Sequence, residues 1–172
     1  MNIPTRDECL KYLHDAGCSE DVITHCRAVS ALAVMIAEKA GADCRLVEAG
    51  ALLHDIGRSR TQGMYHAIEG ARIVLDLGLP RELSLIVERH MGAGIPRAEA
   101  VRLGLPEKDY VPRTLEEKIV AHADNLIDYD HRQPIEREIE KVQAKGRMQL
   151  AARLRALHEE LSAVCGQDLD SI

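Results

Sequence analysis

Apolar residues recur every three or four positions along most of the 172-residue chain, and glycine and proline separate the segments with this period. No stretch alternates between apolar and polar residues as a half-buried strand does. Gly146 is expected to break or kink the last of the long helices, and a short extra helix is expected over 97–103. The long helices are predicted over about 5–16, 19–40, 44–54, 65–77, 80–91, 114–129 and 134–164. The fold class is therefore all-α, a compact bundle of six to seven helices.

Local signals support these boundaries. Ser19 and Asp43 are typical N-caps, and Thr114 with Glu117 forms a capping-box sequence. The segment 44–54 is apolar on nearly all sides, which predicts a central helix covered by its neighbours. Residues 92–113 form a long connection that is either a lid or wall over a pocket, or an excursion on the surface.

Composition narrows the class of protein. Hydrophobic residues make up 46% of the chain and charged residues 29%, as in an ordinary globular domain, while Phe and Trp are absent. The formal net charge of −6 argues against broad binding to duplex nucleic acid, which requires a positive surface. The five cysteines are odd in number and lack CxxC spacing, so reduced thiols are expected. Without an apolar signal core or a membrane-spanning run, the expected location is the cytoplasm.

Four histidines fall within the apolar stripes of four predicted helices, where a core normally excludes polar groups. A single one would be read as a hydrogen-bonded core imidazole, but four on separate helices favour bound metal, with two ions expected. His14 and His158 lie off their stripes and His131 is in a polar loop, whereas His122 is expected to be structural or to support the site. The expected metal ligands are His25, His54, Asp55, His66, His90 and Asp124.

These residues resemble a known family. His25, then His54 and Asp55 within the string HDIG, then Asp124 are ordered as in the HD superfamily of metal-dependent phosphohydrolases, over about 19–128. The resemblance implies a bundle of five or more helices. His66 and His90 are similar to the two additional histidines of the dinuclear branch, where the aspartate of the HD pair bridges two metals. A single HD domain over 1–172 is expected, with its metal-binding core at about 19–130 and the C-terminal helix, about 134–165, packed on it.

Donor chemistry supports the same division of ligands. A carboxylate has two oxygens and can bridge two metals, whereas a neutral imidazole offers one lone pair, so Asp55 is the expected bridge. His25, His54 and Asp124 would then hold one ion, and His66 and His90 the other. Nitrogen and oxygen ligands without thiolate suit Fe, Mn, Co, Ni or Zn.

Two such ions polarise a phosphoryl oxygen and acidify a bound water, which predicts hydrolysis of a phosphate ester or anhydride. Asp55 and Arg58 are the expected catalytic residues. Arg58 directly follows HDIG, where the family often has Lys, and is the first candidate for binding the transferred phosphoryl group. Arg27 and Lys118 are further candidates, with a solvated surface charge as the alternative for both.

Differences between this sequence and the motifs of known HD branches restrict the class of substrate. The stretch MGAGIP after His90 lacks the HE...GYP string of the cyclic diguanylate phosphodiesterase branch. The string EEKIVAHADNLID is similar to bacterial HD hydrolases of diadenosine tetraphosphate and to archaeal HDIG proteins, and the GLP and DYVP elements favour the archaeal set. A small nucleotide-like phosphorylated substrate is therefore expected, with no membrane partner.

Two other functions and one question of assembly stay open. A dinuclear iron oxygenase would use similar ligands, and a binding module would keep the metal and sense a nucleotide without turnover. The leucine stripe of the final helix either docks on the parent bundle or forms a homodimer contact.

Overall fold

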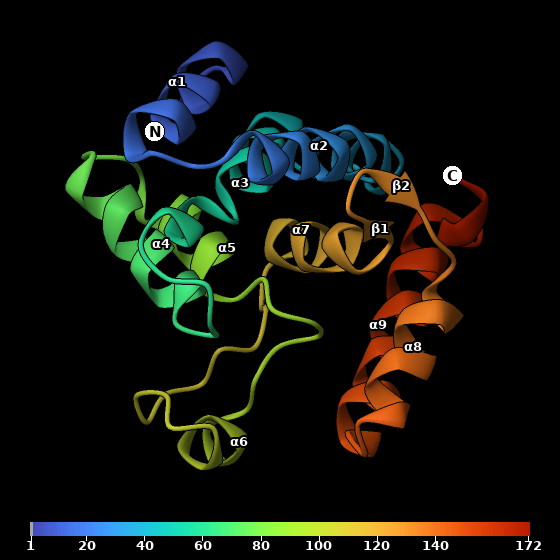
Figure 1. The fold of residues 1–172 in the computed structure, drawn as a ribbon. Helices are drawn as coiled ribbons and strands as arrows, with labels where there is room; N and C mark the ends of the chain where they lie inside the picture. Colours follow the sequence, from blue (N-terminus) through green and yellow to red (C-terminus); the bar gives the residue numbers. More distant parts are fainter. Residues whose placement is uncertain (1) are drawn as a thin grey trace.

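The structure is a computed structural model, and it describes residues 2–172. Over these residues the chain forms nine α-helices, two 3₁₀ helices (η1 and η2) and one small antiparallel ladder, which confirms the all-α class (Figure 1). The helices are α1 Arg6–Ala16, α2 Glu20–Ala40, α3 Cys44–Leu53, η1 Ile56–Ser59, α4 His66–Asp76, α5 Arg81–Glu88, α6 Arg97–Arg102, α7 Leu115–Asn125, α8 Ile135–Ala144, α9 Met148–Cys165 and η2 Leu169–Ser171. The total exceeds six to seven because it counts the short extra helix, α6, and the two parts, α8 and α9, into which the expected break at Gly146 divides the final segment.

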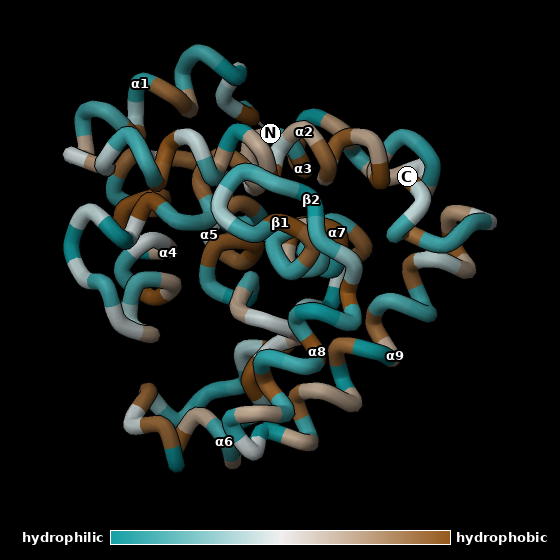
Figure 2. The backbone as a smooth tube through the Cα atoms, turned by 45° about the vertical axis from the view of Figure 1, so that its right-hand side comes forward, coloured by the Kyte–Doolittle hydropathy of each residue, from teal (hydrophilic) through white to brown (hydrophobic). Residues whose placement is uncertain are grey.

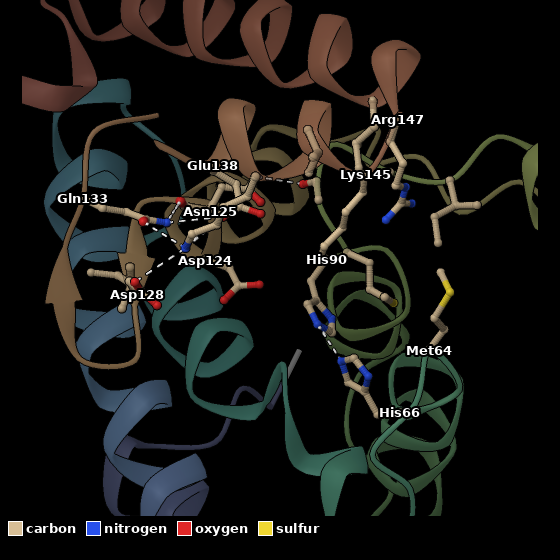
Figure 3. A pocket seen from close by; sticks show the side chains of 18 of the residues that line it. Met64, His66, His90, Asp124, Asn125, Asp128, Gln133, Glu138, Lys145 and Arg147 are labelled. Carbon is tan, nitrogen blue, oxygen red and sulfur yellow. Dashed lines mark hydrogen bonds and ion pairs between the residues drawn. The ribbon is translucent and has the colours of Figure 1, made fainter. Parts of the chain in front are cut away.

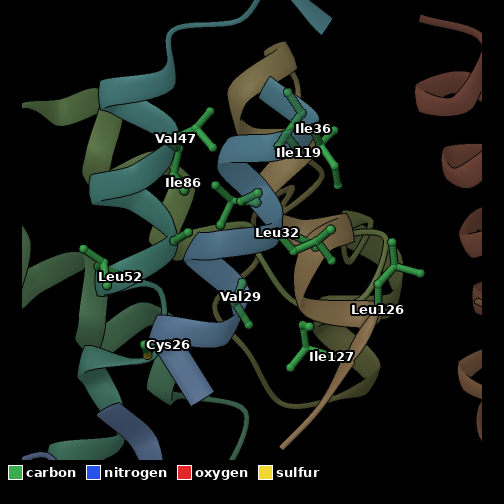
Figure 4. Packing of buried hydrophobic residues seen from close by; sticks show 14 of the residues in the cluster. Cys26, Val29, Leu32, Ile36, Val47, Leu52, Ile86, Ile119, Leu126 and Ile127 are labelled. Atoms are coloured by element: carbon green, nitrogen blue, oxygen red, sulfur yellow. The ribbon is translucent and has the colours of Figure 1, made fainter. Parts of the chain in front are cut away.

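The core lies where α2, α3 and α7 pack together, with α5 and α9 against them (Figure 4). Ile36 of α2, Ile119 of α7 and Leu126 are completely buried there. Burial of each such side chain stabilises the fold by roughly 1.5–3 kcal/mol. Hydrophobic stretches gather at the centre of the molecule, where α3, α5 and α7 meet (Figure 2). This packing fixes α2 beside α7 and so determines where their polar residues meet.

The capping signals act largely as predicted. Ser19 Oγ accepts a hydrogen bond from the Val22 N–H, and Asp43 accepts from the N–H groups that begin α3. Thr114 caps α7, but only half of the expected capping box forms because the Glu117 carboxylate turns away from the cap. It accepts instead from Arg89 and from the Arg113 N–H. The buried pair between Arg89 and Glu117 therefore ties α7 to the end of α5.

The helix predicted over 114–129 does not reach Tyr129, so this expected boundary is wrong. α7 ends at Asn125, and β1, Ile127–Asp128, pairs with β2, His131–Arg132, in an antiparallel ladder. The turn between them contains Tyr129, whose φ of 57° is the one positive value among the described non-glycine residues. Because polar turn residues interrupt the apolar stripe here, the backbone finds its hydrogen bonds in a hairpin. This turn places the Tyr129 carbonyl beside α2.

The charged final segment divides at Gly146, which adopts the left-handed φ of 72° that favours glycine. α8 and α9 then pack on each other as a hairpin against the bundle (Figure 1). The leucine stripe of α9 is buried within the chain, as the docking alternative predicts, and comprises Leu150, Leu154, Leu157 and Leu161. None of the helices described is long and apolar enough to span a bilayer.

Candidate metal centre

The fold brings all six predicted ligands together. His25 is in α2, His54 caps the C-terminus of α3, and Asp55 follows it directly. His66 begins α4, His90 follows α5, and Asp124 is in the last turn of α7. His54, Asp55, His66 and His90 have at most 4% of their surface exposed, whereas His25 and Asp124 are partly open to solvent. The site therefore has a buried floor and one accessible side.

Backbone carbonyls orient all four imidazoles in the same way. The Nδ1 atoms lie 2.6–2.8 Å from the carbonyl oxygens of Tyr129, Ala51, Gly63 and Val87, for His25, His54, His66 and His90 respectively. A carbonyl can only accept, so each Nδ1 carries the proton. In a neutral ring the Nε2 atom then holds a lone pair, which is the arrangement typical of metal-bound histidine.

These Nε2 lone pairs face other acceptors. His66 Nε2 is 3.2 Å from His90 Nε2 and 3.0 Å from Asp55 Oδ1. His25 Nε2 is 2.9 Å from Asp124 Oδ1. His54 Nε2 and Asp55 Oδ1 are buried and have no hydrogen-bond partner. Unpaired buried acceptors are costly, and the charge that would satisfy them together is a cation. The donor set therefore fits a metal site.

The two oxygens of Asp55 face opposite halves of the cluster. Oδ1 is 3.0 Å from His66 Nε2 and 3.5 Å from His90 Nε2. Oδ2 is 3.7 Å from His54 Nε2 and accepts a 2.6 Å hydrogen bond from Arg58 Nε. Asp55 belongs both to the ligand group with His25 and His54 and to the group with His66 and His90. A carboxylate in this position has the geometry of a bridge.

Electrostatics favour positive charge at the centre. Burial opposes ionisation of Asp55, but the neighbouring imidazoles of His54, His66 and His90 hold its pKa well below the usual range. The pKa of Asp124 is lowered in the same way, against burial, by His54 and His25. Both carboxylates are therefore ionised at neutral pH. Burial lowers the pKa of His90, which keeps that imidazole neutral and its Nε2 free to bind a metal.

Gly57 of the HDIG string allows this cluster to form because of close backbone packing, not because of a left-handed conformation. Residues 56–59 continue α3 as η1, and φ at Gly57 is not positive. A Cβ atom at Gly57 would lie 1.8 Å from the His66 carbonyl oxygen and 2.5 Å from Gly70 N. Glycine is needed because the first turn of α4, which carries His66, packs directly on this backbone.

Four of the six candidate ligands, His25, His66, His90 and Asp124, line a cleft of about 340 Å³. Gly92, Gly94 and Ile95 line it, so the start of the 92–113 connection is a wall of the cleft. The hairpin of α8 and α9 forms a second wall (Figure 3). This wall contributes polar and basic residues that the sequence did not single out, namely Gln133, Glu138, Lys141, Lys145 and Arg147. The sequence feature that could have indicated this wall is the spacing of Lys141 and Lys145, which are four residues apart and therefore lie on one face of a helix.

The predicted phosphate-binding residues are placed differently from one another. Arg58 lines the cleft and also binds Asp55. Arg27 is exposed and does not line the cleft. Lys118 pairs with Glu160 of α9 at 2.6 Å and is also outside it. The structure therefore does not bring Arg27 or Lys118 to the candidate metal ligands, because Arg27 projects into solvent and Lys118 faces α9.

A second histidine cluster lies apart from the cleft. His122 Nε2 is 2.9 Å from His158 Nδ1, and His158 Nε2 is 2.9 Å from Asp168 Oδ1. His158 is only 8% exposed, so the expectation that it lies off its stripe is wrong. Leu154 is four residues before it and Leu161 three after it, and this spacing already indicated the buried face.

Comparison with known proteins identifies the family. The HD domain family matches residues 22–128, and the chain belongs to it. A tRNA (cytidine(56)-2'-O)-methyltransferase of Thermoplasma volcanium is 49% identical over 99% of this chain, and one of Picrophilus torridus is 48% identical over 99%. The match covers 50% of each of these relatives, so the chain spans about half their length. An uncharacterized protein of Methanocaldococcus jannaschii is 54% identical over 74% of this chain and 79% of its own.

Solved structures share the fold. The HD domain of the L. monocytogenes phosphodiesterase PgpH, in complex with cyclic-di-AMP, superposes with a TM-score of 0.57 over 92% of this chain and 96% of that domain. A second structure of the same domain gives a TM-score of 0.55 over 92% and 97%. The sequence identity is 18% in both cases, so this likeness concerns the fold.

Proposed function

We propose that this chain is a metal-dependent phosphohydrolase that cleaves a phosphate ester or anhydride of a nucleotide-like molecule with metal-activated water. The observation that carries the proposal is the convergence of four histidine Nε2 atoms and two carboxylates at one side of an open cleft, which His25, His66, His90 and Asp124 line directly. A structural metal site would be closed by its ligands, whereas this one has an accessible side for substrate.

Each of the candidate ligands has a proposed role. His25, His54 and Asp124 would hold one divalent transition ion, His66 and His90 would hold a second, and Asp55 would contribute to both. Fe, Mn, Co, Ni or Zn suits these donors. When bound, such ions supply Lewis acidity and lower the pKa of a coordinated water. The Tyr129 carbonyl fixes the ring of His25 through a 2.6 Å hydrogen bond.

Arg58 is the proposed phosphoryl-binding residue. Its Nε atom is engaged by Asp55, and its Nη1 atom is 3.5 Å from the Gln62 carbonyl, a weak contact. The remaining N–H groups of the guanidinium are available to a phosphoryl oxygen in the cleft, where a charge-assisted bond is strong. The bond to Asp55 holds the side chain in place, so Arg58 also positions the bridging carboxylate.

A nucleoside fits the other side of the cleft. Met64, Met91 and Ile95 line it beside the metal ligands and provide an apolar surface for a base. The bound cyclic-di-AMP of the PgpH domain is consistent with a nucleotide in this fold. A cleft of about 340 Å³ is at the lower end of the range for small-ligand pockets, which favours one nucleotide unit inside it.

The two methyltransferase relatives suggest a second candidate, a phosphate on RNA. Because this chain matches only half of each, we assign methyl transfer to the half that is not matched. The HD half would then act on a terminal or cyclic phosphate of an RNA. The net charge of −6 restricts this candidate to a chain end that enters the cleft.

One experiment tests both candidates. Protein purified without chelator is analysed for metal and then assayed anaerobically with mononucleotides, cyclic dinucleotides, dinucleoside polyphosphates and RNA oligonucleotides with terminal or cyclic phosphates. We expect close to two metal ions per chain and phosphate release or diester cleavage for at least one class. Oxygen consumption with no hydrolysis would instead indicate a di-iron oxygenase. A fully loaded site without turnover of any class would indicate a binding module, and either result overturns the proposal.

A further inference from the structure

We infer that Lys145 and Arg147, at the corner between α8 and α9, form a binding site for a second phosphate group of the substrate. This inference rests on the proposed function and narrows it. The substrate class becomes a molecule with at least two phosphate groups, such as a nucleoside polyphosphate, a dinucleotide or an RNA end. The group cleaved lies at the metal ligands, and the other group lies at this corner.

The two side chains share one cleft with the metal ligands. Lys145 caps the C-terminus of α8, and Arg147 precedes the first residue of α9. Gly146 between them reverses the chain direction with its left-handed backbone. Both residues line the cleft together with His25, His66 and His90. Figure 3 shows both side chains extending from this corner on the side of the cleft away from His66.

Among the Lys and Arg side chains that line the cleft, Lys145 and Arg147 are the two whose positive charge is least compensated by neighbouring carboxylates. Lys141 lies within 3.6 Å of Gln133, Asp128 and Glu138 oxygens. Arg58 binds Asp55 at 2.6 Å. In the part of the chain that the structure describes, Lys145 has no ion-pair partner.

Arg147 makes one long contact, 3.4 Å to Glu99 Oε1, while the other oxygen of Glu99 binds Arg153 at 2.7 Å. Most of the N–H groups of Arg147 are therefore unoccupied. α8 ends at this corner and α9 begins there, so the negative end of one helix dipole offsets the positive end of the other, and the positive charge comes from the two side chains. A chain with a net charge of −6 thus concentrates uncompensated positive charge at one edge of this cleft.

The chemistry that fits such a pair is a phosphate oxyanion. Arg and Lys bind phosphate through charge-assisted hydrogen bonds, the guanidinium in a forked geometry and the ammonium as a point charge. A nucleoside monophosphate whose phosphate occupies the metal ligands has no anion left for the corner. A nucleotide with two phosphates has one group for each position. Selectivity for the second over the first is the measurable consequence.

The test is calorimetric titration of the metal-loaded protein with AMP and with α,β-methylene-ADP, which has two phosphates and resists cleavage. We expect the double variant Lys145→Gln/Arg147→Gln to lose about tenfold in affinity for α,β-methylene-ADP and at most about twofold for AMP. The matched control is Lys39→Gln/Arg45→Gln, which removes the same charge from exposed positions outside the cleft. It should bind both ligands as the unmodified protein does.

Equal losses for the two ligands, no loss for either, or absence of α,β-methylene-ADP binding to the unmodified protein would each overturn the inference. Retention of metal and of the unfolding midpoint in the double variant shows that the fold is intact. The titration needs no turnover. A protein that hydrolyses nothing but shows the selective loss would therefore refute the proposed function and leave the second phosphate site standing.

Discussion

Two buried clusters of imidazole and carboxylate groups lie on the two sides of α7, and they use their protons in opposite ways. At the metal centre every Nδ1 proton goes to a backbone carbonyl, and the Nε2 lone pairs face one another and two carboxylates. In the second cluster, His122 donates from Nε2 to His158 Nδ1, and His158 donates from Nε2 to Asp168. There each proton reaches an acceptor within the cluster.

Metal-binding and structural histidines can be told apart by where their protons go. Buried histidine alone does not mark a metal site, because both clusters contain it. The deciding feature is an excess of acceptors over protons. In the second cluster only His122 Nδ1 lacks a partner, and burial together with His158 lowers the pKa of His122 to about 3, so the ring stays neutral. The pair therefore needs no cation and serves to join α7 to α9.

The largest effect is expected at the bridge of the metal centre. Asp55→Ala removes the carboxylate shared by both ligand groups and leaves Arg58 without its partner. We expect loss of metal retention and a fall in hydrolysis on the order of a thousandfold, since the ions supply several kcal/mol to the transition state. Metal analysis and the phosphate-release assay measure both. Unchanged metal content and activity would show that Asp55 is not a bridge.

The sequence predicted this centre better than its surroundings. The six predicted ligand residues lie in helices or directly after them, and the apolar periodicity of those helices together with the HDIG string predicted that the residues lie close together, as they do. The hairpin at 127–132 escaped prediction because strands of two residues are too short to show alternation. Lys145 and Arg147 escaped it because they are charged residues at a helix break, outside any apolar stripe. Only the docking of α8 and α9 on the bundle, through contacts distant in sequence, brings them to the cleft.

His158→Ala tests the structural role of the second cluster. We expect a smaller effect than at Asp55, on the stability of the fold instead of on metal binding. The variant leaves the His122 N–H buried without an acceptor and opens a space between α7 and α9. We expect a loss of about 2–4 kcal/mol in the free energy of unfolding, measured by urea denaturation, with metal content unchanged. His131→Ala, at an exposed histidine, is the control and should leave both quantities as they were. Loss of metal from His158→Ala alone would mean that the two clusters are one functional unit.

The smallest effect concerns the exposed end of the second cluster. Asp168 accepts hydrogen bonds from the Asp170 N–H and from His158, both at 2.9 Å, and these lower its pKa. A carboxyl group with a lowered pKa stabilises the folded protein above its unfolded value, near 4, and this stabilisation is lost as the pH falls through the folded value. Asp168→Asn keeps an acceptor oxygen but has no charge to titrate. We expect it to be less stable than the unmodified protein at pH 7, by under about 1 kcal/mol, and the difference to shrink towards pH 3.

A double-mutant cycle with His158→Ala identifies the origin of this pH dependence. If the charge of Asp168 acts through His158, Asp168→Asn will have less effect on the unfolding midpoint at pH 7 when His158 is already alanine. The bond from the Asp170 N–H remains in both backgrounds, so a residual difference is expected. An equal effect in the two backgrounds would assign the stabilisation to that backbone bond alone. The second cluster would then end at the pair of histidines, with Asp168 serving only the turn that begins η2.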